Sequence, residues 1–248
     1  MIYLTGFHAI EECLKSGRPC GPLLVAKPGP RSRELVALAA ERRVRVDRVG
    51  THDLDRIALD HRGVVLELEA PAEAGGAGVS LEAFIAGLEG DGGGRRDALV
   101  LILDEITDPH NYGAILRSCD QFGVDLVVSR DHRSAQHAAV IARTSAGASA
   151  WVPQAETANL PRAAEALKAA GFWIYGAHME GDAAGRIDLR GRIALVLGGE
   201  GTGISRLLRE RCDGLIAVPS RGRIDSLNVS VAAGVLMYEV TRQRDGRS

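Results

Sequence analysis

The sequence predicts an α/β protein in which a small N-terminal α/β domain precedes a larger domain built on a parallel sheet. Three observations predict this class. From residue 98 onward, continuous apolar runs alternate with helical patterns, as in parallel sheets. Before residue 70, shorter strand and helix patterns form a separate set, and a stretch rich in Pro, Ala and Gly follows them. The chain has 248 residues, which is enough for two such domains.

The N-terminal set is predicted from the spacing of its apolar residues. Helices are expected over residues 6–15, 31–43 and 51–59, and strands over residues 22–26, 44–49 and 63–68. Residues 71–78 and the glycine-rich residues 91–96 are predicted to be flexible, with one short helix over 81–88 between them. The expected division is an N-terminal domain over 1–70, a linker over 71–97 and a second domain over 98–248.

The second domain begins with a continuous apolar run over residues 98–103, which predicts a strand buried on both faces. Further strands are expected over 125–129, 172–177, 193–198 and 214–218, and helices over 112–122, 135–142, 160–170, 205–211 and 228–244. This alternation predicts a parallel sheet, in which ligands bind beyond the carboxyl ends of the strands.

Composition limits the class of protein. Hydrophobic residues make up 46% and charged residues 25%, as in globular proteins, and no apolar run approaches transmembrane length. The four cysteines form no CxxC pair or Cys/His cluster, which argues against a zinc site and favours a reducing cytoplasm. The first residues lack the basic stretch of a signal peptide. We therefore expect a cytoplasmic protein with no metal site and no membrane span.

A first motif, N-x-G-A-I-x-R, follows the first buried strand and runs from Asn111 to Arg117. Its position at a strand end fits a ligand site. Equally, Asn111 could be a helix cap and Arg117 a surface residue.

A second motif, G-x-E-G-x-G, spans Gly198 to Gly203 after another strand. Its glycines allow the backbone to approach a ligand closely. Glu200 inside this turn is either exposed to that ligand or a solvated loop charge.

A third motif, P-x(6)-SLNVSVAAG, begins at Pro219 after the last strand. Ser226 or Asn228 could cap the helix that follows. The small residues of that helix permit close packing against another backbone.

In this order and spacing, the three motifs resemble those of the SpoU (TrmH-type) family of RNA 2′-O-ribose methyltransferases. The resemblance covers roughly residues 99–244. The segments at Gly6–Glu11 and His61–Val64 are also similar to the accessory RNA-binding domain of the ribosomal-RNA branch of that family.

The resemblance implies a fold, a cofactor and an oligomer. It implies a trefoil-knotted (SPOUT) parallel-sheet catalytic domain, with the small N-terminal α/β domain binding RNA. It also implies a homodimer through the knotted domain. S-adenosyl-L-methionine would bind in the knotted loops, where the cofactor-binding residues would be Leu197, Gly198, Gly199, Gly201, Ile216, Val218, Ser226 and Leu227.

The resemblance further implies that Asn111, Arg117, Glu200, Ser226 and Asn228 are catalytic. Arg117 matches the family's catalytic arginine. A guanidinium stays protonated, so we expect Arg117 to stabilise the developing alkoxide or to clamp a phosphate, and not to act as a base. We expect Glu200 to orient Arg117 through a charge-assisted hydrogen bond.

RNA contact must come from local patches, because the formal net charge is only -2. Residues 27–48 hold seven Lys or Arg against three acidic residues, which predicts a phosphate-binding face or simply a solvated helix surface. The candidate RNA-binding residues are Arg31, Arg33, Arg42, Arg43 and Arg45.

The expected substrate is a guanosine of large-subunit (23S) ribosomal RNA. One alternative is a transfer-RNA 2′-O-methyltransferase, a branch that typically lacks the N-terminal domain. A non-catalytic RNA-binding relative is disfavoured because all five catalytic positions are filled. A nicotinamide-dependent enzyme should carry its glycine fingerprint after the first strand, and this chain does not.

Overall fold

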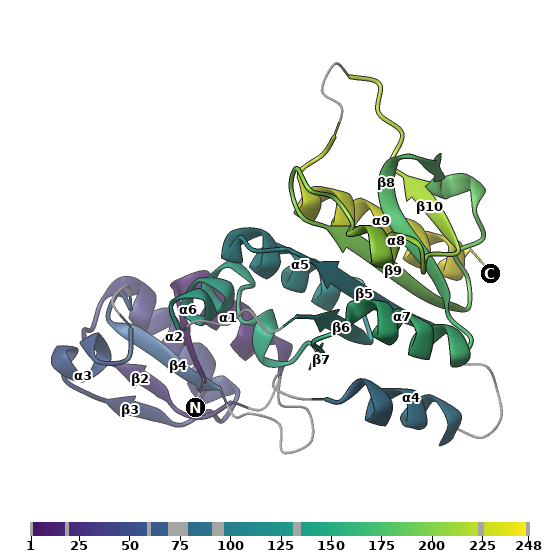
Figure 1. Ribbon diagram of the computed structural model, residues 1–248. Helices are drawn as coiled ribbons and strands as arrows, with labels where there is room; N and C mark the ends of the chain where they lie inside the picture. The colour runs from purple at the N-terminus through teal and green to yellow at the C-terminus, as the bar shows by residue number, and fades with distance from the viewer. Residues whose placement is uncertain are drawn as a thin grey trace.

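The computed structural model describes residues 2–17, 20–58, 61–68, 79–90, 97–130, 135–222 and 226–246. The segments predicted to be flexible, 71–78 and 91–96, lie outside these residues. Two sheets organise the chain, one of four strands and one of six (Figure 1). None of the helices in the described part of the chain has the length and apolar character needed to cross a bilayer.

The N-terminal sheet has the order β1-β4-β2-β3. Its elements are β1 (Ile2–Thr5), α1 (Phe7–Ser16), β2 (Leu23–Val25), α2 (Pro30–Glu41), β3 (Val46–Arg48), α3 (Thr51–Asp55) and β4 (Val64–Leu68). β1 was not predicted from the sequence, because four residues are too few to show a period. β1 is antiparallel to β4. The predicted strands over 22–26, 44–49 and 63–68 are confirmed with shorter bounds.

The larger sheet has the order β10-β8-β9-β5-β6-β7, and every neighbouring pair is parallel. Its strands are β5 (Ala98–Asp104), β6 (Leu126–Ser129), β7 (Gln154–Glu156), β8 (Trp173–Ala183), β9 (Arg192–Gly198) and β10 (Gly214–Ala217). The predicted parallel α/β sheet is therefore confirmed. The passage of the chain through a knot stays a prediction of the resemblance.

Helices cover both faces of this sheet (Figure 1). One face packs against α5 (Pro109–Gln121), α6 (Ala135–Thr144) and α9 (Val229–Asp245). The other packs against α4 (Leu81–Gly90), α7 (Leu160–Ala169) and α8 (Arg206–Arg209). Every residue of β5 is buried, because neighbouring side chains point to opposite faces and both faces are covered.

Helix α4 belongs to this core, although it was predicted within a linker. Leu81 and Leu88 are buried in the same cluster as the residues of α7. The Phe84 ring lies 6.5 Å from that of Phe172, centroid to centroid, and Arg192 donates a hydrogen bond to the carbonyl of Leu88. The packing ties α4 to the six-stranded sheet.

Strand β8 leaves the regular register beside β10. Leu215 of β10 is opposite Gly176, but the next residue, Ile216, is opposite Asp182. Five residues of β8, 177–181, therefore bulge out at this point. A Cβ atom on Gly181 would lie 2.5 Å from the backbone of Ile216, so a side chain here would collide with β10.

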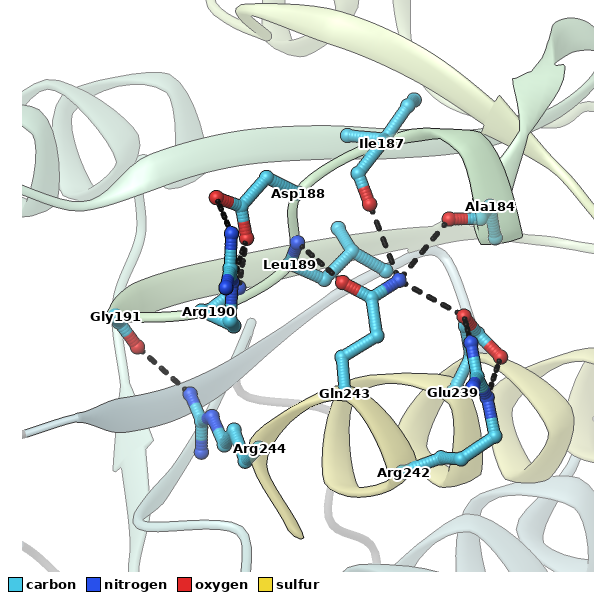
Figure 2. Close-up of polar contacts among 10 residues, drawn as sticks. All are labelled: Ala184, Ile187, Asp188, Leu189, Arg190, Gly191, Glu239, Arg242, Gln243 and Arg244. Carbon is cyan, nitrogen blue, oxygen red and sulfur yellow. Dashed lines mark hydrogen bonds and ion pairs between the residues drawn. The ribbon is translucent and has the colours of Figure 1, made fainter. Parts of the chain in front are cut away.

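The C-terminal part of α9 is fixed to the segment between β8 and β9 (Figure 2). The amide of Gln243 accepts a hydrogen bond from the backbone N–H of Leu189 at 2.9 Å and donates one to the carbonyl of Ile187 at 3.1 Å. Arg244 donates to the carbonyls of Gly191 and Ala98, which lie at the starts of β9 and β5. Burial lowers the pKa of Arg244, against the opposing effect of nearby aspartates.

The two sheets meet through a small apolar contact. Ala150 and Trp151, which follow α6, pack in the cluster that forms the core of the N-terminal sheet. A Cβ atom on Gly147 would lie 2.9 Å from Leu4 of β1. The Trp151 indole N–H also donates a hydrogen bond to Asp120 of α5 at 2.7 Å, which fixes the ring at this junction.

Candidate active site

Helix α5 begins at Pro109, shortly after β5 ends at Asp104, and carries the first motif. Asp108 is its N-cap and accepts hydrogen bonds from the backbone N–H groups of His110 and Asn111. Pro109 occupies the first turn, where its missing N–H costs nothing. The prediction that Asn111 could be the cap is wrong, because Asp108 already fills that role. The side chain of Asn111 therefore stays available for contacts across the edge of the sheet.

The glycine-rich segment after β9 folds into a tight hairpin in which the N–H of Gly203 donates to the carbonyl of Gly199. A Cβ atom on Gly198 would lie 2.1 Å from the backbone of Gly203, and one on Gly199 would lie 2.6 Å from the carbonyl oxygen of Glu105. Only glycine permits this approach. The hairpin holds Glu200 at its tip, exposed to solvent.

Asn111, Glu200 and Asn228 form one hydrogen-bonded cluster, although they lie far apart in the sequence. The Glu200 carboxylate oxygen Oε1 accepts hydrogen bonds from Asn111 Nδ2 at 3.1 Å and from Asn228 Nδ2 at 2.7 Å. Asn228 Nδ2 also donates to Asn111 Oδ1 at 2.9 Å. The three motifs therefore converge at the carboxyl edge of the sheet.

Asn228 has two roles in this cluster. Its Oδ1 accepts hydrogen bonds from the backbone N–H groups of Ser230 and Val231, so it is the N-cap of α9. Its Nδ2 supplies the two bonds to the other members. Its whole amide is thus used, and the cap fixes the direction in which Nδ2 points.

Two other predicted catalytic residues lie outside the cluster. Within the described part of the chain, the Glu200 carboxylate pairs with the two asparagines and not with Arg117, so the expected Arg117–Glu200 bond is wrong. Arg117 lies six residues after Asn111 on α5, about 240° around the helix. It therefore projects from a different, exposed side. Ser226 is also exposed, and the structure gives its side chain no hydrogen bond within the described residues.

The predicted cofactor-binding residues lie at the carboxyl ends of β9 and β10 and in the segment before α9. Leu197 and Ile216 are buried in the core, Val218 is half-buried, and Gly201 and Leu227 are exposed. Strand β8 lies between β9 and β10, so its bulge at residues 177–181 adjoins both groups. This bulge was not predicted from the sequence. Gly181 was its one signal, since its close approach to β10 requires glycine.

The five candidate RNA-binding arginines are all exposed, on α2 and in the connection from α2 to β3. Arg31 is paired with Glu34 at 2.7 Å and Arg45 with Asp47 at 2.8 Å. The structure gives Arg33, Arg42 and Arg43 no such ion pair with a described residue. These three are therefore the more available cations for RNA.

Two family models match the chain. Residues 98–238 match the SpoU rRNA Methylase family, and residues 3–74 match the RNA 2'-O ribose methyltransferase substrate binding family. The chain belongs to the SpoU rRNA methylase family. The fold and motif resemblance described above is thereby confirmed, and the larger sheet is the SpoU methylase unit.

Relatives and solved structures agree with this membership. The 23S rRNA (guanosine-2'-O-)-methyltransferase RlmB of Xanthomonas campestris is 44% identical, covering 98% of this chain and 97% of its own. The SpoU methyltransferase AviRb of Streptomyces viridochromogenes, solved in complex with AdoMet, has a TM-score of 0.69 at 26% identity and covers 98% of this chain and 90% of its own.

A transfer-RNA enzyme of the SpoU family matches a smaller part of the chain. The TrmH/SpoU tRNA modifying enzyme of A. aeolicus has a TM-score of 0.56 at 30% identity, covering 67% of this chain and 83% of its own. The similarity to the Xanthomonas 23S enzyme is thus both closer and more complete.

Proposed function

We propose that this protein transfers a methyl group from S-adenosylmethionine to the ribose 2′-hydroxyl of a guanosine in 23S ribosomal RNA. The observation that carries this proposal is the Asn111–Glu200–Asn228 cluster, which joins all three SpoU motifs at one edge of the sheet. The nearly full-length match to a 23S guanosine methyltransferase supports the substrate.

The residues at this edge fit S-adenosylmethionine. The tight glycine hairpin presents backbone groups where other residues would have side chains. Apolar surface comes from Leu227, which is exposed, and from Val218, which is half-buried. Backbone donors and acceptors with apolar walls suit an adenosine group. When bound, the cofactor supplies an electrophilic methyl group on a sulfonium. Calorimetric binding in the presence of a chelator tests this assignment, and binding only when metal is restored would contradict it.

The cluster positions a carboxylate for the substrate. Glu200 Oε1 is held by two amides, while Oε2 accepts no hydrogen bond from a described residue. We assign Oε2 to orient the ribose hydroxyl, which must be fixed close to the transferred group and must lose its proton. Asn111 and Asn228 keep the carboxylate in place without neutralising it.

Arg117 supplies the positive charge in this proposal. It stabilises the developing alkoxide or clamps the adjacent phosphate, because its guanidinium stays protonated. Arg117→Ala should bind cofactor normally and lose on the order of 10²–10³ in rate. Arg117→Lys should also fail, because an ammonium cannot form a bidentate clamp. Loss of cofactor binding in Arg117→Ala would make the residue structural.

A second copy of the chain is proposed to pack on α9. Val231, Val235 and Tyr238 of α9 are 51%, 40% and 55% exposed, and their spacing of three or four residues places them along one face of the helix. Leu227, just before the N-cap Asn228, is 49% exposed. An exposed apolar stripe of this kind supports a homodimer through the methylase domain. Light scattering should give a dimer mass, and a monomer at micromolar concentration would contradict it.

The N-terminal unit, residues 1–70, is proposed to bind RNA. Residues 98–248 are proposed to carry out the chemistry, and α4 is added to this second unit because α4 packs in the core of the six-stranded sheet. Reversing the charges of Arg42, Arg43 and Arg45 should weaken RNA binding and flatten its salt dependence, while cofactor binding stays unchanged. An unchanged salt slope would place the RNA face elsewhere. A ribosomal-RNA substrate supports a cytoplasmic location, as do the four cysteines, which form no disulfide in the described part of the chain.

The decisive experiment maps ribose methylation across ribosomal RNA in a strain lacking the protein. One guanosine of 23S RNA should lose its methyl group and regain it when purified protein and S-adenosylmethionine are added. A change confined to transfer RNA would establish the transfer-RNA alternative instead.

A further inference from the structure

A recess opens at the carboxyl ends of β5 and β6, beside the catalytic cluster. Its volume is about 30 Å³, enough for a water molecule or one oxygen of a larger group. The residues around it include Ile106, Thr107, Pro109, Ser129, Arg130 and His137. Pro109 lies in the same first turn of α5 as Asn111, so the recess adjoins the catalytic cluster.

A buried carboxylate follows Leu103, one of the residues that line the recess. Asp104, the last residue of β5, is 0% exposed, and its Oδ2 accepts a hydrogen bond from the N–H of Ser205 at 2.8 Å. Its other oxygen, Oδ1, has no hydrogen-bond partner among the described residues, and Arg130 Nη2 lies 3.9 Å from it. That distance is too long for a hydrogen bond. Asp104 thus attracts Arg130 without using its donors.

Arg130, which lines the recess, keeps donors that no described residue accepts. A guanidinium carries five N–H donors in a planar fork, and the Arg130 side chain is 36% exposed, so its terminal Nη donors can be reached from solvent. The Nε of Arg130 is buried and has no partner among the described residues, so the terminal nitrogens are the ones that a ligand would meet. The positive charge of the guanidinium favours an anionic acceptor there.

The substrate provides such an acceptor. Every nucleotide next to the target ribose carries a phosphodiester, yet the described residues of this edge include the exposed acids Glu105, Asp108 and Glu200. These acids repel phosphate, so a cation is needed to bring the RNA backbone close. Arg130 directly follows β6 at this edge, and arginine binds phosphate bidentately.

We propose that Arg130, held by Asp104, binds a backbone phosphodiester of the RNA adjacent to the ribose that is methylated. The inference rests on the proposed function and adds a substrate contact to it. Arg130 would fix the backbone on the β6 side of the site, while the Asn111–Glu200–Asn228 cluster orients the ribose on the β9 side.

The test measures the affinity of the full-length protein for an unmethylated 23S ribosomal-RNA transcript over a series of salt concentrations. Arg130→Ala should weaken binding about tenfold and lower the slope of log affinity against log salt by about 0.7–0.9, the share of one phosphate. Arg130→Lys should keep the slope, because the charge is retained, while losing part of the affinity. Cofactor affinity should be unchanged in both variants.

Arg190→Ala is the matched control. Arg190 is also exposed and paired with an aspartate, Asp188, but it lies before β9 at the opposite edge of the sheet. The Arg190→Ala variant should keep the wild-type slope of log affinity against log salt. If Arg130→Ala does not fold, Arg130→Gln is measured in the same way, since it removes the charge while keeping a polar side chain.

Two outcomes would overturn the phosphate contact while leaving the proposed function intact. One is a wild-type salt slope in Arg130→Ala or Arg130→Gln. The other is a loss of cofactor affinity, which would assign Arg130 to the carboxylate of S-adenosylmethionine. A wild-type protein that neither binds nor methylates the transcript would refute the proposed function itself, and the phosphate contact with it.

Discussion

Replacing Asn228 with aspartate separates the two roles of this residue. Aspartate caps a helix as well as asparagine does, so the substitution Asn228→Asp keeps the acceptor for the N–H groups of Ser230 and Val231. It removes both Nδ2 bonds, to Asn111 and to Glu200. The cap survives, while the link between the three motifs is lost.

The magnitude follows from the distance between the two side chains. Asn228 Nδ2 lies 2.7 Å from Glu200 Oε1, and a carboxylate oxygen in its place would repel that oxygen by about 1.5 kcal/mol in water. The dielectric constant of water applies because both side chains are exposed. A better interaction with the helix dipole returns about 0.3–1 kcal/mol. The two exposed hydrogen bonds that are lost contribute about 0.5 kcal/mol each. We therefore expect a loss of about 1–2 kcal/mol in the free energy of unfolding.

The effect on methyl transfer should be much larger. The two carboxylates move apart, and Glu200 loses the two bonds that fix it. Misplacement of a positioning group by about 1 Å costs roughly 10²-fold in rate. Asn159→Asp is the matched control, because Asn159 caps α7 by accepting from the N–H of Arg162, away from this cluster.

The assays are urea denaturation and single-turnover transfer of a labelled methyl group to 23S ribosomal RNA. Asn159→Asp should unfold close to the wild-type midpoint and Asn228→Asp somewhat below it, and only Asn228→Asp should lose transfer. Wild-type turnover in Asn228→Asp would refute the positioning role of the bridge. A loss of several kcal/mol in Asn228→Asp alone would show that the cap geometry, and not the bridge, is what the substitution damages.

Four further changes test the surrounding structure. Glu105 has φ +58°, so Glu105→Gly should raise the free energy of unfolding by about 0.5–1 kcal/mol in urea, and a decrease would contradict strain at this turn. Gly113→Ala would place its Cβ 1.8 Å from Thr144 Oγ1, between α5 and α6. The clash should lower the free energy of unfolding by about 1–3 kcal/mol, although alanine favours helices, and a gain in stability would refute the clash. Gln243→Leu leaves buried backbone groups unpaired and should cost about 1–3 kcal/mol in the same measurement, whereas a neutral result would make the contacts dispensable. Burial raises the pKa of the Cys212 thiol to about 11, so it stays protonated at pH 8 and iodoacetamide should label it slowly, and faster as the pH rises towards 11; rapid labelling at pH 8 by mass spectrometry would contradict this.

The sequence predicted the elements whose pattern is strong and local. β5 was evident because its first six residues, 98–103, are an unbroken apolar run, as a strand buried on both faces requires. β7 (Gln154–Glu156) was missed because it is short and polar at its ends. The bulge of β8 was missed because register depends on the neighbouring strand β10. α4 was predicted as a helix but was assigned to a linker, because glycine-rich sequence flanks it. Its packing against the six-stranded sheet depends on tertiary structure.

The candidate site shows the same division. Helical and strand periods placed Asn111, Glu200 and Asn228 at the ends of strands or the starts of helices. Only the family resemblance joined them, since the contact spans 117 residues between Asn111 and Asn228. The Asp-Pro pair before Asn111 was a readable sign that Asp108 is the cap. The Arg117–Glu200 pairing was wrong because residues of one motif can lie on different sides of a helix. Asn111 contacts Glu200, and the six residues from Asn111 to Arg117 turn Arg117 about 240° away from it.

The contacts at the two ends of α9 bear on how the site opens. Asn228 ties the start of the helix to Asn111 and Glu200. Gln243 and Arg244 tie its last turns to the segment before β9 (Figure 2), and Arg244 also donates to the carbonyl of Ala98 at the start of β5. Contacts at both ends, together with its residues in the core of the sheet, favour unfolding of α9 as one unit with the sheet. The backbone amides of α9 should therefore exchange with deuterium only when the whole methylase unit unfolds. Substrate entry would then have to proceed with α9 held in place.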